Sequence, residues 1–162
     1  MRKVILCFSF AAAGLLAVPA AYAATATGSL DVKVSINETC SVTSPSSTTL
    51  DFGSQTLLNV AVDAQTNISV QCSTGTDYDV SLDGGLNTSR QMRLGSTSNY
   101  VDYELYTDAA RTTAWPTTAG SAPYSNTGTG SAQNITVYGQ IPVQTTPVGG
   151  SYVDTVAITV TY

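Results

Sequence analysis

The sequence predicts an antiparallel β-sandwich of immunoglobulin-like type, and three observations favour it. Thr, Ser, Val and Tyr dominate the chain, and β-branched and aromatic residues suit a pleated, half-buried surface. Apolar and polar residues alternate in short runs, which is the signature of strands with one buried face. Turn-forming residues separate these runs, and no window keeps apolar residues at helical spacing for three turns. Many short strands joined by polar turns are typical of such a sandwich.

The predicted strands follow one another along a single domain. Each is a short alternating run, and turn-rich stretches such as TSPSSTT, DGGLNTS and TTPVGGS lie between them. The long polar stretch 116–132 is predicted to be a surface loop, so residues 24–162 fit one domain. In chain order, the strands are expected at 28–36, 39–43, 67–72, 77–83, 99–108, 133–141 and 152–162.

Residues 1–23 are predicted to be a secretory signal peptide. Arg2 and Lys3 give a basic start, and the apolar stretch VILCFSFAAAGLLAV follows. Ala21-Tyr22-Ala23 is a small-x-small cleavage site, which would leave Ala24 as the first mature residue. The alternative is an uncleaved membrane anchor, for which the apolar run is short. The sequence therefore indicates an exported protein.

The charge of the mature chain argues against nucleic acid as a partner. The full sequence has a formal net charge of −5 at pH 7, and two of its six cations lie in the signal peptide. Residues 24–162 thus keep four cations against eleven carboxylates, with no basic patch for phosphates or an anionic membrane. The four cations are Lys33, Arg90, Arg93 and Arg111.

Two cysteines, Cys40 and Cys72, remain once the signal peptide and its Cys7 are removed. In an exported protein, an even pair is expected to form one disulfide. The alternatives are a metal site or a redox pair, but the chain has no histidine and no CxxC. Closing this loop would stabilise the fold by roughly 3–4 kcal/mol in the chain-entropy model.

The sequence offers no set of residues that predicts an enzyme or a cofactor. Without histidine, acid–base chemistry would fall on carboxylates, tyrosines or lysine, and no nucleophile–base pair is visible. The densest carboxylate group is Asp77, Asp79 and Asp83 in DYDVSLDGG. A calcium site is one interpretation, but the spacing differs from an EF-hand loop, and the solvated face of a strand is favoured. We expect a non-enzymatic protein without a metal or cofactor.

Apolar strands at both termini are the most informative feature. The chain ends on GSYVDTVAITVTY with no strand after it to cover its far edge, and the mature chain begins almost directly with another alternating strand. An open edge with an apolar face favours pairing with another chain. We therefore expect the N-terminal strand of one copy to pair with the C-terminal strand of the next, as in β-strand addition. The apolar residues are Gly28, Leu30, Val32, Val34 and Ile36 at the start, and Val156, Ile158, Val160 and Tyr162 at the end.

The order of motifs resembles the spore coat protein U domain family, and closely resembles the major pilins of archaic chaperone–usher pili. The matching stretches span nearly the whole mature chain, and they differ mainly in loop lengths around 44–62 and 116–132. In order, they are TGSLDVKVSI followed by TC, ISVQC leading into YDVSLDGG, YELYTDAARTTAW, VYGQIP and GGSYVDTVAITVTY.

This resemblance implies an incomplete immunoglobulin-like sandwich that is completed by donor-strand exchange. The donor strand would occupy about residues 25–36, with Leu30, Val32, Val34 and Ile36 entering the acceptor. The strand carrying Val156, Ile158, Val160 and Tyr162 would line the acceptor groove and bind the chaperone, and Cys40–Cys72 would be the disulfide typical of the family.

The resemblance also implies the partners and the location. A periplasmic chaperone would lend a strand, and an outer-membrane usher would exchange it for the next copy, giving a homopolymeric cell-surface pilus for adhesion and biofilm formation. The alternative is a self-complete secreted spore-coat or matrix protein, whose N-terminal strand folds into its own sandwich.

Overall fold

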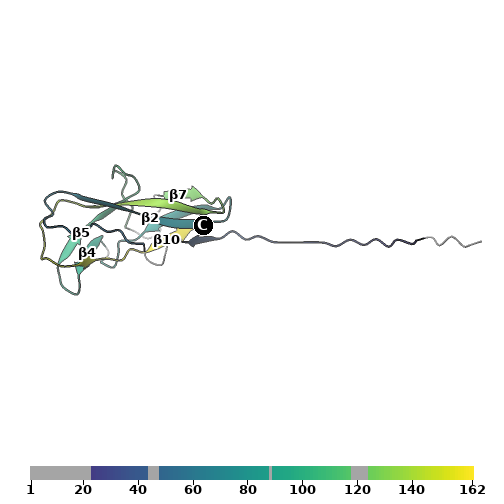
Figure 1. Ribbon diagram of the computed structural model, residues 1–162, viewed down its shortest axis with the longest axis horizontal. Coiled ribbons are helices and arrows are strands. Elements are labelled where there is room, and N and C mark those ends of the chain that lie inside the picture. The colour runs from purple at the N-terminus through teal and green to yellow at the C-terminus, as the bar shows by residue number, and fades with distance from the viewer. Residues whose placement is uncertain (1–22, 44–47, 88, 118–123) are drawn as a thin grey trace, which may run out of the picture. The chain divides into compact units, whose positions relative to one another are not determined.

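The computed structural model describes residues 23–43, 48–87, 89–117 and 124–162. Contacts within the chain divide it into residues 1–35 and 36–162, which are described separately. In the described part of 36–162 the regular structure is entirely β-strand, and every strand pairing is antiparallel (Figure 1). The predicted all-β, antiparallel fold class is confirmed. The strands are β1 Cys40–Val42, β2 Val62–Cys72, β3 Asp77–Leu82, β4 Gln91–Leu94, β5 Tyr100–Asp102, β6 Glu104–Tyr106, β7 Tyr124–Thr127, β8 Ala132–Ile141, β9 Tyr152–Val153 and β10 Ile158–Thr161.

The strands form three sheets. The largest has the order β1-β2-β8-β6, and its centre is the long β2–β8 pair, which runs from Val62 opposite Ile141 to Gln71 opposite Ala132. The other two have the orders β10-β3-β7 and β5-β4-β9. Both β1 and β10 therefore lie at an edge of their sheets.

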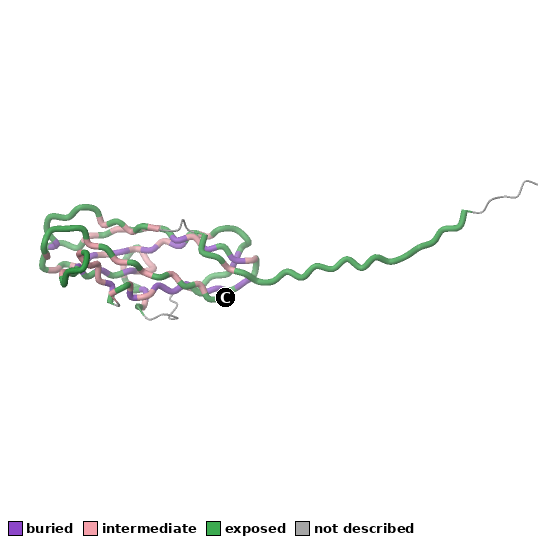
Figure 2. Tube along the Cα trace, turned by 90° about the horizontal axis from the view of Figure 1, so that it is seen from below, coloured by how far each residue is buried: buried purple, intermediate pink, exposed green. Residues whose placement is uncertain are grey.

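One hydrophobic core joins residues from all three sheets. Along β8 the buried side chains Ile135, Val137 and Ile141 alternate with more exposed ones, as expected for a strand with one face inward. Trp115, at 1% exposure, fills the core below Tyr124, whose ring stacks on it at a centroid distance of 6.3 Å. Figure 2 shows the buried residues running through the middle of the body, with exposed chain around them.

The body has two distinct ends. At one end, which we call the disulfide end, lie Cys40, Cys72 and the turns 73–76 and 128–131, because β2 finishes and β8 begins there. At the other, which we call the far end, β2 begins opposite the last residue of β8, and the loops 50–61 and 142–151 follow. Figure 1 places β4 and β5 toward this far end, away from the C-terminus.

Three strand predictions need correction. The run 99–108 splits at Tyr103 into β5 and β6, which belong to different sheets, because the Tyr103 amide donates to the carbonyl of Arg90 and the chain crosses between layers there. The C-terminal run also divides, into β9 and β10. Part of the predicted loop 116–132 forms β7, which pairs with β3. Strand β4 was not predicted, since QMRL is too short and too mixed to show a period.

The N-terminal predictions fare differently. Segment 23–39 contains no strand, so the strand predicted at 28–36 is absent from the single chain, because a strand needs a neighbour to pair with. The signal peptide prediction falls, apart from Ala23, outside the described residues. Within the residues that are described, no helix has the length and apolar content needed to cross a membrane.

Candidate functional site

The candidate site is the free edge of β10. On its other side β10 pairs with β3, with Ile158 opposite Leu82 and Val160 opposite Val80. These cross-strand pairs put the apolar residues of both strands on the same face, toward the core. The sheet order leaves the second edge of β10 without a strand among the described residues. The backbone groups on that edge are available to another strand.

Burial along β10 shows that the core is unfinished at this edge. Val80 and Leu82 of β3 are 0% and 3% exposed, whereas Ile158 and Val160, opposite them, are only half-buried. Val156 is likewise half-buried against the core, and Tyr162 is 60% exposed. Core-facing residues of a closed sandwich would be covered by a further strand. Ile158 and Val160 therefore share one partly covered apolar face, and Val156 also packs against the core.

A second sheet edge lies close to the first. Strand β1 is the outer strand of the large sheet, and some of its Cα atoms lie within 8 Å of β10. Although they are this close, β1 and β10 do not pair with each other. Val42 at the end of β1 is 41% exposed. Two unpaired strand edges thus lie close together, and the exposed Val42 stands at the end of one of them.

The predicted donor residues are the most exposed large apolar side chains of the described chain. Leu30, Val32, Val34 and Ile36 are each 85–86% exposed. Their alternation with Ser29, Asp31, Lys33 and Ser35 gives the segment one apolar and one polar face when it is extended. Gly28, which precedes them, has no atom near the position of a Cβ. The structure leaves the predicted donor and acceptor residues uncovered, and their pairing stays a prediction.

Two carboxylates fix the start of β10. An Asp83 oxygen accepts from the amide of Ala157 at 2.8 Å, while the Asp83 amide donates to the Ala157 carbonyl at 3.1 Å. The carboxylate thus takes the place of a backbone acceptor and ends the β3–β10 ladder. Asp154 accepts from the Leu86 amide at 2.9 Å and from the Tyr103 hydroxyl at 2.7 Å. These bonds hold residues 154–157 out of the sheet and explain the break in the predicted C-terminal strand.

The surroundings of Asp154 are tightly packed. Burial, and then the hydrogen bond to Asp154, raise the pKa of the Tyr103 phenol above its usual range. Burial lowers the pKa of the nearby Arg90 guanidinium, whose Nη2 donates to the Leu82 carbonyl at 3.1 Å. Gly85 has a φ of 79°, and a Cβ there would overlap the Asp154 carboxylate. The sequence analysis did not predict this network. The signal that could have shown it is the DGG turn after β3 together with Asp154 inside the alternating C-terminal run.

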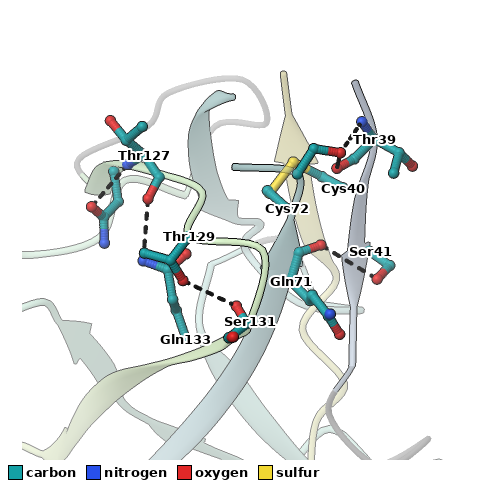
Figure 3. The surroundings of a disulfide bond; sticks show 11 residues. Thr39, Cys40, Ser41, Gln71, Cys72, Thr127, Thr129, Ser131 and Gln133 are labelled. Carbon is teal, nitrogen blue, oxygen red and sulfur yellow. Dashed lines mark hydrogen bonds between the residues drawn. A yellow bond between two sulfur atoms is a disulfide. The ribbon is translucent and has the colours of Figure 1, made fainter. Parts of the chain in front are cut away.

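Figure 3 shows the disulfide between Cys40 and Cys72 and the residues around it. Cys40 and Cys72 are cross-strand partners in β1 and β2, and their sulfur atoms are bonded. The predicted disulfide is therefore confirmed. The Thr39 amide donates to the Ser73 hydroxyl at 3.1 Å, and the Ser73 amide donates to the Thr39 carbonyl at 2.9 Å. These bonds attach β1 to the body immediately after the N-terminal segment.

Removing the disulfide is expected to lower the yield of folded protein. Cys40→Ser or Cys72→Ser would remove roughly 3–4 kcal/mol of support from one small core. Non-reducing mass spectrometry of exported protein should find the pair linked in the wild type. The double variant is the control, because it lacks the disulfide without leaving a lone thiol. Two free thiols in wild-type exported protein would contradict the assignment.

The carboxylates considered for calcium do not converge. Asp77 and Asp79 accept hydrogen bonds from the hydroxyls of Thr127 and Ser125 across the β3–β7 pair, on the exposed face. Asp83 instead bonds the backbone at the start of β10. Among the described residues, no group of three or more metal-ligating side chains comes together. Asp77 and Asp79 thus lie on an exposed face as expected, whereas Asp83 does not share it.

A solved structure shares this architecture. It is the crystal structure of the CsuC–CsuE chaperone–tip adhesion subunit pre-assembly complex from archaic chaperone–usher Csu pili of Acinetobacter baumannii. The match has a TM-score of 0.56 at 24% sequence identity and covers 78% of this chain. This chain spans 40% of the length of the matched chain. The body thus has an all-β fold similar to that of a chaperone–usher pilus subunit complex.

The family follows from the sequence comparison. The Spore Coat Protein U domain matches residues 26–159, and the chain belongs to this family. Protein U of Myxococcus xanthus is 33% identical over 169 residues, which cover 94% of this chain and 93% of that protein. The matched region includes the predicted donor segment from Leu30 to Ile36 and the first two residues of β10.

Proposed function

We propose that this protein is a structural pilin subunit that polymerises by donor-strand complementation into a chaperone–usher surface fibre. The observation that carries the proposal is the exposure, at 85–86%, of four alternating aliphatic residues ahead of β1. Soluble chains rarely leave such a row uncovered unless it is a binding segment. The half-buried face of β10 offers an unfinished core of matching chemistry.

The energetics favour polymerisation. Fully burying an aliphatic side chain contributes roughly 1.5–3 kcal/mol, so Leu30, Val32, Val34 and Ile36 together contribute about 6–12 kcal/mol gross. Each new backbone hydrogen bond along β10 adds about 0.5–1.5 kcal/mol. Because the donor completes the core of the acceptor, assembly and folding stability are linked. A fibre built this way dissociates very slowly.

The same open edge explains the proposed partners. A subunit with an uncovered apolar edge aggregates unless another strand covers it. A periplasmic chaperone supplies that strand during export, and an outer-membrane usher exchanges it for residues 25–36 of the next copy. The fibre then lies on the cell surface and serves adhesion and biofilm formation. The signal peptide 1–23 directs this export.

The state of the full-length exported protein tests the proposal. Expressed with its chaperone and usher, the protein should give a ladder of bands on unboiled denaturing gels and a single band after boiling. The alternative, a self-complete spore-coat or matrix protein, forecasts a stable monomer on gel filtration without either partner. A folded monomer whose residues 28–36 resist proteolysis would overturn the pilin assignment.

A further inference from the structure

The far end of the body carries a second group of uncovered apolar residues. Leu57, Val60, Val143 and Val148 are each 58–63% exposed. Their two loops are tied together, because the Leu58 carbonyl accepts from the Gln144 amide at 3.0 Å and the Leu58 amide donates to the Thr146 hydroxyl at 2.9 Å. We call these four residues the apolar pole. The hydrogen bonds hold the two loops that carry these residues side by side.

Beside the apolar pole the surface is hollowed. A cavity of about 630 Å³ opens between the two loops, with Phe52, Leu58, Met92 and Tyr152 among its lining residues. The Tyr152 hydroxyl donates to the Val148 carbonyl at 2.7 Å and fixes the rim. In the sequence of both loops, 50–62 and 141–153, Asp51 is the only charged residue. Asp51 lines the cavity together with polar and apolar side chains, and a hollow of mixed polarity with a single charge is suited to a protein partner.

The direction of strand pairing indicates which partner reaches this surface. Every strand pairing in the described body is antiparallel, so a donor strand added to β10 is expected to run antiparallel to it. Strand β10 runs toward the disulfide end, since Thr161 lies opposite Asp79, near the start of β3. The donor therefore runs the other way, and its last residue, Ile36, lies toward the far end of the acceptor.

The short linker then places the body of the donor subunit. From Ile36 to Cys40 an extended chain spans at most about 14 Å. Cys40 is already held in the donor subunit by the disulfide and by β1. The disulfide end of that subunit must accordingly lie within this reach of the acceptor's far end. Its turns 73–76 and 128–131 consist of Ser, Thr and Gly and bear no charge, so they can cover an apolar surface.

We propose that the apolar pole is a second subunit–subunit interface, covered in the fibre by the disulfide end of the next copy of this chain. The inference rests on the proposed function and adds a contact between bodies to the donor strand. The contact limits rotation about the linker and slows dissociation, because both interfaces must open before a subunit leaves.

Fibres with a charged pole test this interface. Val143→Asp or Val148→Asp should still form fibres, but these should dissociate in denaturant about tenfold faster or more, since a carboxylate is left against an uncharged surface. Ala110→Asp is the matched control, because it adds the same charge at an exposed site on the turn after β6. The same pole variants completed by a free donor peptide should melt at the wild-type temperature, since a peptide brings no body.

A cysteine pair provides a measurement that does not depend on stability. With Val143→Cys and Thr74→Cys in one chain, mild oxidation should link neighbouring subunits in fibres but not peptide-completed monomers. The pole interface alone would be overturned by two results together. The cysteine variant would form fibres normally but show no such link, and the Val143→Asp and Val148→Asp fibres would dissociate at the wild-type rate. A wild-type chain that gives no ladder would instead overturn the proposed function.

Discussion

Replacing Val32 with aspartate is expected to abolish fibres while leaving a chaperone-bound subunit in the periplasm. Val32 is 85% exposed in the single chain and lies in the middle of the apolar row of the donor. On pairing, the new carboxylate would enter an apolar face without a partner, which costs several kcal/mol in addition to the roughly 1.5–3 kcal/mol lost with the valine. Unboiled gels should show no ladder, and co-purification with the chaperone should be unchanged.

Lys33 supplies the matched control. It adjoins Val32 but lies on the opposite, polar face of the extended segment. Lys33→Gln should therefore form fibres at the wild-type level. Equal sensitivity, or equal tolerance, at both positions would show that the segment does not act as a donor strand.

The alternation of apolar and polar residues was a reliable guide to strands that have one face on the core and stay in one sheet. The alternation in 77–83 and 133–141 predicted β3 and β8 to within a residue or so, because each has one face on the core and one outside. The same reasoning found only the second half of β2. Its first half, from Val62, alternates more weakly because two of its inward positions are the small Ala64 and the polar Thr66.

The wrong strand boundaries share one physical cause. Groups that are distant in the sequence decide where the hydrogen-bonded pairing of two strands ends. Nothing local in YVDYELY marks the change of sheet at Tyr103, which depends on the Arg90 carbonyl. Similarly, β10 begins late because Asp83 and Asp154 intercept backbone amides. Strand β7 forms because β3 offers an edge to residues 124–127, although their sequence favours a turn.

The candidate site was more predictable than the fold around it. Its signal is an apolar row that no strand covers among the described residues, and it is visible both as alternation in the sequence and as exposure in the structure. The apolar pole was not predicted, since single Leu and Val residues in loops have no period. The hydrogen bonds of Leu58, which link residues distant in the sequence, bring those loops together.

Deleting residues 24–34 is expected to give a subunit that binds its chaperone but cannot extend a fibre. The truncated chain keeps β10, with Ile158 and Val160 half-buried, but has lost three of the four donor aliphatics. Without the chaperone it should aggregate, because its open apolar edge remains. Gel filtration and light scattering, with and without the chaperone, would measure this.

A peptide with the sequence ATGSLDVKVSI, residues 26–36, should rescue the truncated subunit as a stable monomer. Because the peptide binds the folded state, thermal stability should rise with its concentration, by about 2.7 kcal/mol at a hundredfold excess over Kd. The same peptide with aspartate in place of Val32 is the control and should have little effect. If the truncated subunit were already stable without peptide, the core would be complete and β10 would need no donor. The melting temperature should thus depend on the concentration of the wild-type peptide but not on that of the aspartate peptide. A self-complete sandwich cannot give this result, since its own strand would already occupy the edge.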